Sequence, residues 1–372
     1  MKNQELFNDN LASSIHEIKF NDLNLITIMK TLLTIFASII IITTGMAQTT
    51  RRVNNNIGIS GTNVYATAQA AHDAAVANDI LIIEPSTTSY GDLTLSKSLK
   101  IYGNGYFLTT NTELKADQRN TTLGIISFNT GSGGSEMYGI TTTTTVTING
   151  VSNITISRNN FGGPLYISNI NKAGTTNTNV SNIFISRNYL SYIQETGTSG
   201  FTISNVLINN NIIGYIGSMN DPRDQNWVIR NNTFTTSAAN NGTIFNSVLE
   251  NNFFYAGGLF SSLSNVTASY NVSTAATFSG GIGNVNNYDY VTNSEIVGSG
   301  TGISTDEAYQ IKAGSSLKTL GSSTSEVGAY GGSTPYIVSG IPAIPSITTM
   351  VNTGTGDATT PVKVTISVKS NN

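Results

Sequence analysis

The sequence predicts an all-β solenoid in which short parallel strands stack on one another, and two observations carry this prediction. The first is composition: of 372 residues, 46 are Asn and 36 are Gly, while only 10% are charged. This balance disfavours a helical bundle, which needs good helix formers. Because 38% of the residues are hydrophobic, simple disorder is also disfavoured. The second observation is an internal repeat.

Six nine-residue segments align without gaps, and their starts lie 29, 23, 21, 20 and 19 residues apart. Position 1 of each segment is Asn, positions 2 and 4 are mostly apolar, and position 7 is always Asn. The segments are residues 153–161, 182–190, 205–213, 226–234, 246–254 and 265–273, and the position-7 residues are Asn159, Asn188, Asn211, Asn232, Asn252 and Asn271.

The alternation of apolar positions 2 and 4 with polar positions 3 and 5 indicates strands with one buried face. No helical pattern separates the repeats, so we expect each strand to pair in parallel with its equivalent in the next coil. Position 7 then forms a structural ladder, in which each Asn amide hydrogen-bonds to the next and adopts the left-handed backbone of a tight bend. The same register extends this ladder outward to Asn104 and Asn293. A β-sandwich with Asn-rich turns is the alternative, but it leaves the invariant columns unexplained.

The segment before the repeats predicts a helix followed by strands. Residues 66–77 are rich in Ala, and Thr67 is suited to the N-cap position. Strand patterns follow at 80–83, 93–95 and 99–102, and the last ends in Gly103-Asn104-Gly105. The wide first gap between repeats predicts an excursion at residues 169–179.

This opening resembles that of right-handed parallel β-helix proteins of the pectin-lyase-like group, over residues 66–297. The resemblance implies a right-handed three-sheet solenoid with an N-terminal capping helix. It implies no activity, because the group contains lyases, hydrolases and adhesins. Residues 306–314 and 327–342 resemble the ends of uncharacterised secreted bacterial β-helix proteins.

Four parts are predicted along the chain. Residues 1–28 are an over-long translation start, or alternatively a cytoplasmic tail. Residues 29–47 read as a signal peptide, because Lys30 precedes a short apolar run and small residues precede the cut before Gln48; a membrane anchor is the alternative. Residues 48–327 form the capped β-helix, and residues 328–372 a C-terminal capping segment with a terminal strand at 361–368. We therefore expect a protein secreted or held in a bacterial cell envelope.

Charge and composition exclude several partners. A net charge of −3 provides no basic footprint for nucleic acid. The chain has no Cys, so thiolate-bound metals and disulfides are excluded. We expect no cofactor, no membrane contact after removal of the signal peptide, and a polysaccharide as the partner.

Two groups of side chains are candidate binding residues. Arg158 and Arg187 occupy the same position of consecutive repeats, with Tyr189 and Lys172 expected nearby. A pair of guanidiniums can hold the carboxylate of an acidic sugar; two solvated side chains are the alternative.

The second group is the charged loop at 220–225, which contains Asp221, Arg223 and Asp224. Such a loop could bind a sugar or Ca²⁺, and a plain polar corner is the alternative.

These observations favour a non-catalytic glycan-binding or scaffold protein. The alternative is a polysaccharide lyase or glycoside hydrolase that acts on an acidic polysaccharide. Residues 150–280 contain few carboxylates, and because none repeats at the coil spacing we expect no stacked carboxylate pair of the kind that hydrolases use. Ice binding by threonine rows needs a constant repeat, and the drifting spacing argues against it. No catalytic residue is assigned.

Overall fold

The computed structural model describes residues 25, 27–33, 48–170, 176–219, 221–236, 241–256, 258–274, 282–288, 293–352, 354–356 and 359–371. The chain divides into two compact units, Met1–Gln48 and Thr49–Asn372. In the first unit residues 27–33 are helical, and no helix in the described residues is long and apolar enough to cross a membrane. Most of the predicted signal peptide, and most of residues 1–28, lie outside the described residues.

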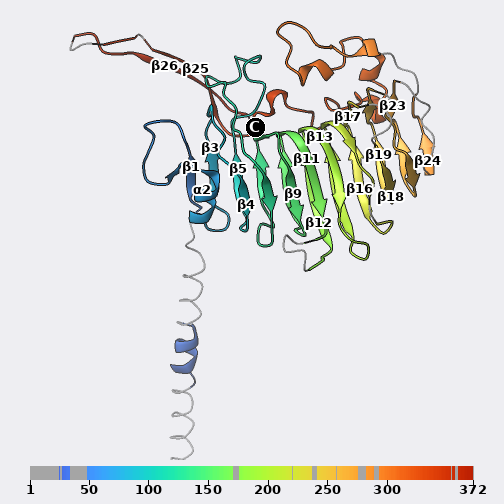
Figure 1. Ribbon diagram of the computed structural model, residues 1–372, viewed down its shortest axis with the longest axis horizontal. Helices are drawn as coiled ribbons and strands as arrows, with labels where there is room; N and C mark the ends of the chain where they lie inside the picture. The colour runs from blue at the N-terminus through green and yellow to red at the C-terminus, as the bar shows by residue number, and fades with distance from the viewer. Residues whose placement is uncertain are drawn as a thin grey trace, which may run out of the picture. The chain divides into compact units, whose positions relative to one another are not determined.

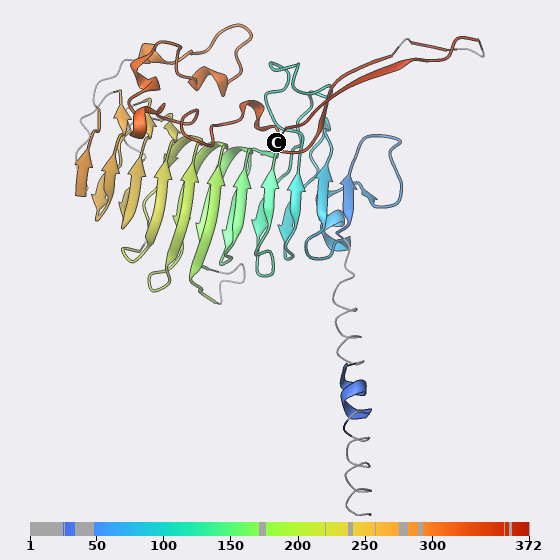
Figure 2. The same ribbon diagram turned by 180° about the vertical axis from the view of Figure 1, so that it is seen from behind.

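The second unit is built mainly from long parallel sheets whose strands stand side by side (Figures 1 and 2). The larger sheet, sheet A, has twelve strands in the described part of the chain. In spatial order they are β2 (Val64–Tyr65), β1 (Thr50–Val53), β3 (Ile80–Ile83), β5 (Lys100–Tyr102), β7 (Glu136–Tyr138), β10 (Ile154–Ser157), β12 (Val180–Ser186), β14 (Ile203–Asn209), β16 (Gln225–Arg230), β19 (Ser247–Glu250), β22 (Thr267–Ser269) and β24 (Ile282–Val285).

The second large sheet, sheet B, has ten strands among the described residues. Its main path runs β23 (Val272–Ser273), β20 (Phe253–Phe254), β17 (Thr233–Phe234), β15 (Ile212–Ile216), β13 (Tyr189–Thr196), β11 (Asn160–Ser168), β9 (Val146–Asn149), β6 (Ile126–Phe128) and β4 (Leu93–Leu95), with β8 (Thr141–Thr142) paired to β11.

Smaller elements complete the unit. A short parallel pair joins β18 (Thr243–Phe245) to β21 (Ser262–Ser264), and an antiparallel hairpin joins β25 (Ser346–Asn352) to β26 (Val364–Lys369). The helices are α2 (Ala68–Ala74) and the 3₁₀ turns η1 (Asn293–Glu295), η2 (Glu307–Tyr309), η3 (Ser316–Lys318), η4 (Ser322–Thr324) and η5 (Val338–Gly340).

From β10 onward the chain alternates between the two large sheets, so each repeat adds one strand to each of them. Equivalent residues pair in register: Ile154 lies opposite Ile183, which lies opposite Val206 and then Trp227. The prediction of an all-β fold with consecutive parallel strands is therefore confirmed. The arrangement is consistent with a parallel solenoid.

The core consists of the inward side chains of the two sheets. At positions 2 and 4, for example, Ile183 and Ile185 are completely buried, and Trp227 is 1% exposed. One continuous hydrophobic cluster extends from Val53 to Ala268. Each such side chain stabilises the fold by about 1.5–3 kcal/mol, so the apolar columns contribute more than any single hydrogen bond.

The position-7 asparagines form a buried, hydrogen-bonded column. Asn188 Nδ2 donates to Asn211 Oδ1 at 2.9 Å, and Asn211 Nδ2 donates to Asn232 Oδ1 at 3.0 Å. The same oxygens accept the backbone N–H of the preceding asparagine, as in Asn188 N to Asn211 Oδ1 at 2.9 Å. Each amide thus satisfies buried backbone groups at the bend between the two sheets.

The left-handed residue of each bend is not the ladder asparagine. Positive φ occurs at position 6, as in Arg187 (58°) and Asn210 (56°), and at position 1, as in Asn182 (59°). Asn tolerates this region better than most residues, which accounts for its frequency at position 1. Position 7 is Asn for another reason: its side chain must both donate and accept hydrogen bonds within the core.

The ends of the column differ from the prediction. Asn271 Nδ2 donates to Asn287 Oδ1 at 2.9 Å, so Asn287 takes the ladder position after Asn271 that was expected for Asn293; Asn293 begins η1. At the other end the Asn159 oxygen accepts the Ile140 N–H at 3.0 Å. Asn104 binds the carbonyl groups of its own loop instead. The predicted register was wrong at both ends, where the repeat loses its regular spacing.

Position 3 is also less polar than expected. Four successive strands of sheet A place apolar side chains there, and these lie in one row across the outer face. Phe184 is 43% exposed and Val248 is 37% exposed. The row consists of Phe184, Leu207, Val228 and Val248.

The start of the unit agrees with the sequence pattern. The predicted helix at 66–77 is present as α2, and the Thr67 side chain accepts the Ala70 N–H as its N-cap. The strands expected at 80–83, 93–95 and 99–102 are β3, β4 and β5. The predicted excursion at 169–179 lies partly outside the described residues.

The C-terminal segment runs back along the unit, past the bends that follow the sheet A strands (Figure 2). Position-6 side chains of four repeats hydrogen-bond to it in reverse order. The contacts are Asn251 to Ser322, Asn210 to Ala329 and Gly331, Arg187 to Thr334, and Arg158 to Ile341. The strand expected at 361–368 is β26, which pairs with β25.

Candidate functional site

A cavity of about 340 Å³ lies between sheet A and the C-terminal segment. Its size is in the range of small-molecule sites, about 300–1,000 Å³. Arg158 and Arg187 both line it, and Thr334 and Ala343 contribute from the C-terminal segment. The two arginines follow β10 and β12, which are neighbouring parallel strands, so the register brings their backbones together.

Neither guanidinium forms an ion pair with a carboxylate among the residues that the structure describes. Arg158 is only 7% exposed, and its Nη1 donates to the Ile341 carbonyl at 2.7 Å. Arg187 Nε donates to the Thr334 carbonyl at 3.3 Å. An arginine has five N–H donors, and among the described residues one donor of each guanidinium has a protein acceptor.

Electrostatics favour an anion at this place. Burial and then the neighbouring charge of Arg187 lower the pKa of Arg158, and burial lowers the pKa of Arg187. Both guanidiniums stay charged at neutral pH because arginine titrates far above it. Two like charges that share a half-buried cavity repel each other, and a bound anion would relieve this repulsion.

Two tyrosines form another wall of the cavity. The rings of Tyr102 and Tyr138 are stacked, with centroids 5.3 Å apart and planes 11° apart. Tyr138 Oη donates to Glu136 Oε2 at 2.7 Å, and Glu136 is paired with Lys100 at 3.2 Å. The carboxylate of Glu136 is therefore already bound by Tyr138 and Lys100.

The floor of the cavity is polar and follows one register row of sheet A. Ser157 lies opposite Ser186, and Ser186 lies opposite Asn209. Tyr138 continues the same row on the other side. Ser186 Oγ donates to Ser157 Oγ at 3.1 Å, and Asn209 Nδ2 donates to Thr334 Oγ1 at 3.2 Å. The oxygen atoms of this row can still accept hydrogen bonds from the hydroxyl groups of a sugar.

The structure separates Tyr189 from this cavity. Its ring packs edge-on against Phe107, with centroids 5.4 Å apart, in an aromatic cluster with Tyr106 and Tyr336. Burial raises the pKa of Tyr189 to about 12. The expectation that Tyr189 accompanies the arginines was wrong, because the chain turns into sheet B after Asn188. Lys172 lies outside the described residues.

The charged loop lies at the opposite end of the sheet A strands from the two arginines. Asp224 directly precedes β16, whereas Arg158 and Arg187 follow strands parallel to it. Asp221 is buried and accepts hydrogen bonds from Arg223 Nη2 at 2.7 Å and from the Gly200 N–H at 2.9 Å. The Arg223 hydrogen bonds hold the pKa of Asp221 well below its usual range. Asp221 and Arg223 thus form a self-contained pair at a corner.

A carboxyl pair that the sequence analysis did not expect lies beneath this loop. Asp224 is completely buried, Glu195 is 3% exposed, and the Glu195 carboxyl group is close enough to influence the pKa of Asp224. Burial raises the pKa of Asp224, and its Oδ1 accepts the Ile203 N–H at 2.6 Å. The two residues do not share a repeat position, so the repeat alignment could not reveal them. Both are enclosed in the core, where a polysaccharide has no access.

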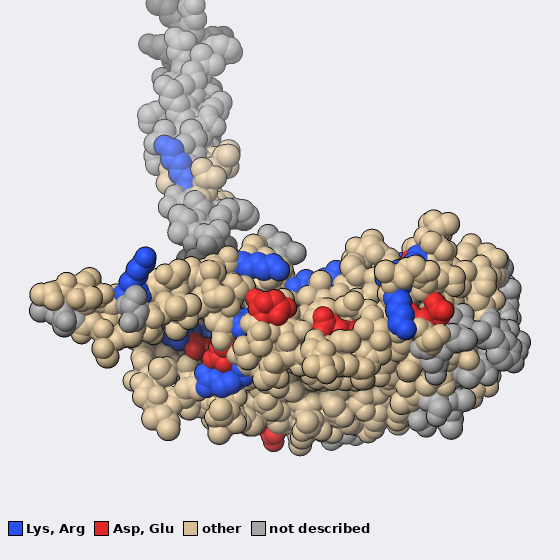
Figure 3. All heavy atoms as spheres, turned by 90° about the horizontal axis from the view of Figure 1, so that it is seen from above, with Lys and Arg blue, Asp and Glu red and all other residues tan. Residues whose placement is uncertain are grey.

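Among the described residues, no group of three or more His, Asp or Glu side chains could hold a metal ion. Charged side chains are also sparse on the face of the molecule shown in Figure 3. The lining residues of the arginine cavity that the sequence analysis missed include the aromatic pair Tyr102 and Tyr138. The sequence pattern that could have indicated these two tyrosines is the apolar–polar alternation of β5 and β7, the strands that precede the six aligned segments.

The chain matches no protein-family model, and the searches of curated proteins and of solved structures found no match either.

Proposed function

We propose that the protein is a non-catalytic binder of an acidic polysaccharide, and that Arg158 and Arg187 hold a carboxylate of the sugar. The observation that carries this proposal is the pair of partly buried guanidiniums with no carboxylate partner among the described residues. Leaving buried charges uncompensated is costly. A ligand carboxylate supplies the missing partner, with hydrogen bonds stronger than those between neutral groups.

Sugar chemistry fits the rest of the cavity. Tyr102 and Tyr138 offer an aromatic wall, while Ser186 and Asn209 offer hydroxyl and amide groups. The exposed apolar row that begins at Phe184 lies on the same face of sheet A. Apolar faces of a neutral part of the chain could rest there while the uronate enters the cavity.

We further propose a right-handed, three-sheet parallel β-helix of the pectin-lyase-like type for residues 48–327. Support comes from the alternation between sheets A and B and from the extra pair β18–β21. In this proposal α2 is the N-terminal cap; its Ala68, Ala71 and His72 are buried against the first strands. Residues 328–372 would form the C-terminal capping segment. The signal-peptide pattern supports export to the bacterial cell envelope or beyond.

The test is calorimetric titration with an oligomer of galacturonic acid and with a neutral glucan of the same length. The parent protein is expected to bind the acidic oligomer only. Losing a charge-assisted hydrogen bond costs about 1.5–3 kcal/mol, so Arg187→Gln is expected to weaken binding by about tenfold or more. Lys312→Gln is the control, because Lys312 is exposed and does not line the cavity.

Equal binding of the acidic and neutral oligomers, or unchanged binding by Arg187→Gln, would overturn the proposal. The alternative function, a polysaccharide lyase or hydrolase, is tested on the same samples with and without Ca²⁺. New absorbance from unsaturated sugar ends, or new reducing ends, that disappears in Arg187→Gln would show that the protein is an enzyme rather than a binder.

A further inference from the structure

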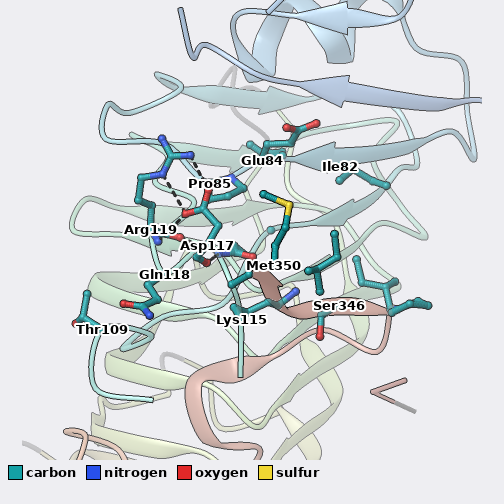
Figure 4. A pocket seen from close by; sticks show the side chains of 17 residues that line it. Ile82, Glu84, Pro85, Thr109, Lys115, Asp117, Gln118, Arg119, Ser346 and Met350 are labelled. Atoms are coloured by element: carbon teal, nitrogen blue, oxygen red, sulfur yellow. Dashed lines mark hydrogen bonds and ion pairs between the residues drawn. The ribbon is translucent and has the colours of Figure 1, made fainter. Parts of the chain in front are cut away.

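A second and larger cavity, of about 990 Å³, lies near the first strands of sheet A (Figure 4). One side is the loop at residues 103–119, which connects β5 to the strands that follow. The other side is the start of the β25–β26 hairpin. Its wall is largely apolar, with Ile82, Pro85, Pro345 and Met350 among the lining residues. It is a different place from the arginine cavity, and no residue lines both.

Hydrogen bonds hold both sides of this cavity in place. The Ala116 N–H donates to the Ile347 carbonyl at 2.9 Å, which joins the loop to β25. Asn104 Nδ2 donates to the carbonyl groups of Asp117 at 2.7 Å and Arg119 at 2.9 Å. The cavity is therefore formed before any ligand arrives, which lowers the cost of binding.

All but one of the charged side chains around the cavity have partners. Asp117 is paired with Arg119, with Arg119 Nη2 at 2.6 Å from Asp117 Oδ2. Glu84 is paired with Arg52 at 2.5 Å and accepts a hydrogen bond from Asn54 Nδ2 at 2.5 Å. These four charges cancel, and they leave the wall electrically neutral apart from one lysine.

That lysine is Lys115, which is 8% exposed and lines the cavity. Within the described residues its ammonium group has neither a carboxylate at ion-pair distance nor a hydrogen-bond acceptor. Burial lowers the pKa of Lys115 to about 8. A large part of the population is still protonated at neutral pH, so the cavity carries one buried positive charge among apolar walls.

We propose that this cavity binds a small amphiphilic carboxylate, with the carboxylate on Lys115 Nζ and the hydrocarbon body against Ile82, Pro345 and Met350. An anionic head gives the ammonium the partner that the chain does not provide. An apolar body removes the exposed parts of the wall from water; Met350, for example, is 60% exposed. A polyol or a neutral sugar would satisfy neither the charge nor the apolar wall.

The test is titration of the full chain with dodecanoate and, separately, with dodecanol, which has the same hydrocarbon body but no charge. We expect one dodecanoate per chain and binding at least tenfold weaker for dodecanol. Lys115→Met keeps the length of the side chain and removes the charge, and is expected to weaken dodecanoate binding at least tenfold. Lys312→Met, at an exposed lysine outside the cavity, is the control and is expected to bind as the parent does.

Met350→Glu keeps the proposal testable should Lys115→Met fail to fold, because Met350 lies on an exposed strand that can accept a charge. A negative charge on that wall is expected to weaken dodecanoate binding at least tenfold as well. Equal affinity for dodecanoate and dodecanol, or multiple binding that no variant changes, would overturn the proposal. Galacturonate binding by Lys115→Met is expected to equal that of the parent, which separates this site from the arginine cavity.

Discussion

Replacement of Asn211 by Ala tests whether the amide column holds the coils together. In the parent, Asn211 Oδ1 accepts the Asn188 N–H at 2.9 Å, and Asn211 Nδ2 donates to the Ile185 carbonyl at 2.9 Å. Both partners are backbone groups enclosed by neighbouring coils, so water cannot easily replace the lost side chain. The variant therefore leaves these two buried backbone groups without their side-chain partner. It also removes the hydrogen bonds to Asn188 Nδ2 and Asn232 Oδ1, but each of these atoms keeps another partner.

Each buried polar group that loses its partner costs about 1–3 kcal/mol, so the free energy of unfolding is expected to fall by about 2–6 kcal/mol. With a urea dependence of about 3 kcal/mol/M, the unfolding midpoint shifts down by about 0.7–2 M. The fluorescence of Trp227 is a suitable probe, because it is the single tryptophan and is only 1% exposed. Far-UV circular dichroism is recorded on the same samples, to check that secondary structure and tryptophan fluorescence are lost at the same urea concentration.

The matched control is Asn182→Gly at position 1. Asn182 has a φ of 59°, which Gly adopts freely, and its amide makes an exposed hydrogen bond to Asn153. Its midpoint is expected to change by less than half of the shift of Asn211→Ala. If the two variants lose equal stability, or if Asn211→Ala unfolds at the parent midpoint, the column is not a major source of stability and the reasoning fails.

Two further variants address the buried carboxyl pair and the C-terminal segment. Because burial raises the pKa of Asp224 above its ordinary value of 3.8, its contribution to stability is complete below that value and is lost as the pH rises through the raised pKa. Asp224→Asn should therefore be more stable relative to the parent at pH 8 than at pH 4, and a difference in midpoint that runs the other way contradicts this assignment. In Gly340→Ala the new Cβ would lie 2.6 Å from the Arg158 carbonyl and closer still to the Tyr106 ring, at a φ of +56°; we expect a loss of at least about 2 kcal/mol and faster proteolysis of the C-terminal segment. Gly298→Ala has a similar φ of +77° but open space, and equal losses for the two variants would exclude the steric explanation.

The repeat made much of the fold accessible from the sequence. Ile183 and Ile185 were identified as core residues because alternation within a strand reports which face is buried. The column through Asn188 and Asn211 could be anticipated because stacked coils place equal positions above one another. The polar character assigned to position 3 failed at Phe184, since an outward side chain need not be polar when it lies in an apolar row.

The candidate sites were less accessible. Arg158 and Arg187 stood out through their shared repeat position, yet the sequence did not indicate that the C-terminal segment covers them. Tyr189 was placed with them on the basis of chain proximity alone. At a bend, however, the next residue already belongs to another sheet and faces another environment.

The sequence alone determined which side chains enter the core, which asparagines stack and where the strands pair in parallel, because these features repeat at short range. Only the tertiary structure decided what lies over the bends, which carboxyl groups meet in the core and that Lys115 has no described partner. These contacts join distant parts of the chain, as from Arg158 to Ile341, 183 residues apart. No periodicity encodes such contacts, since they depend on the path that the chain takes after the last repeat.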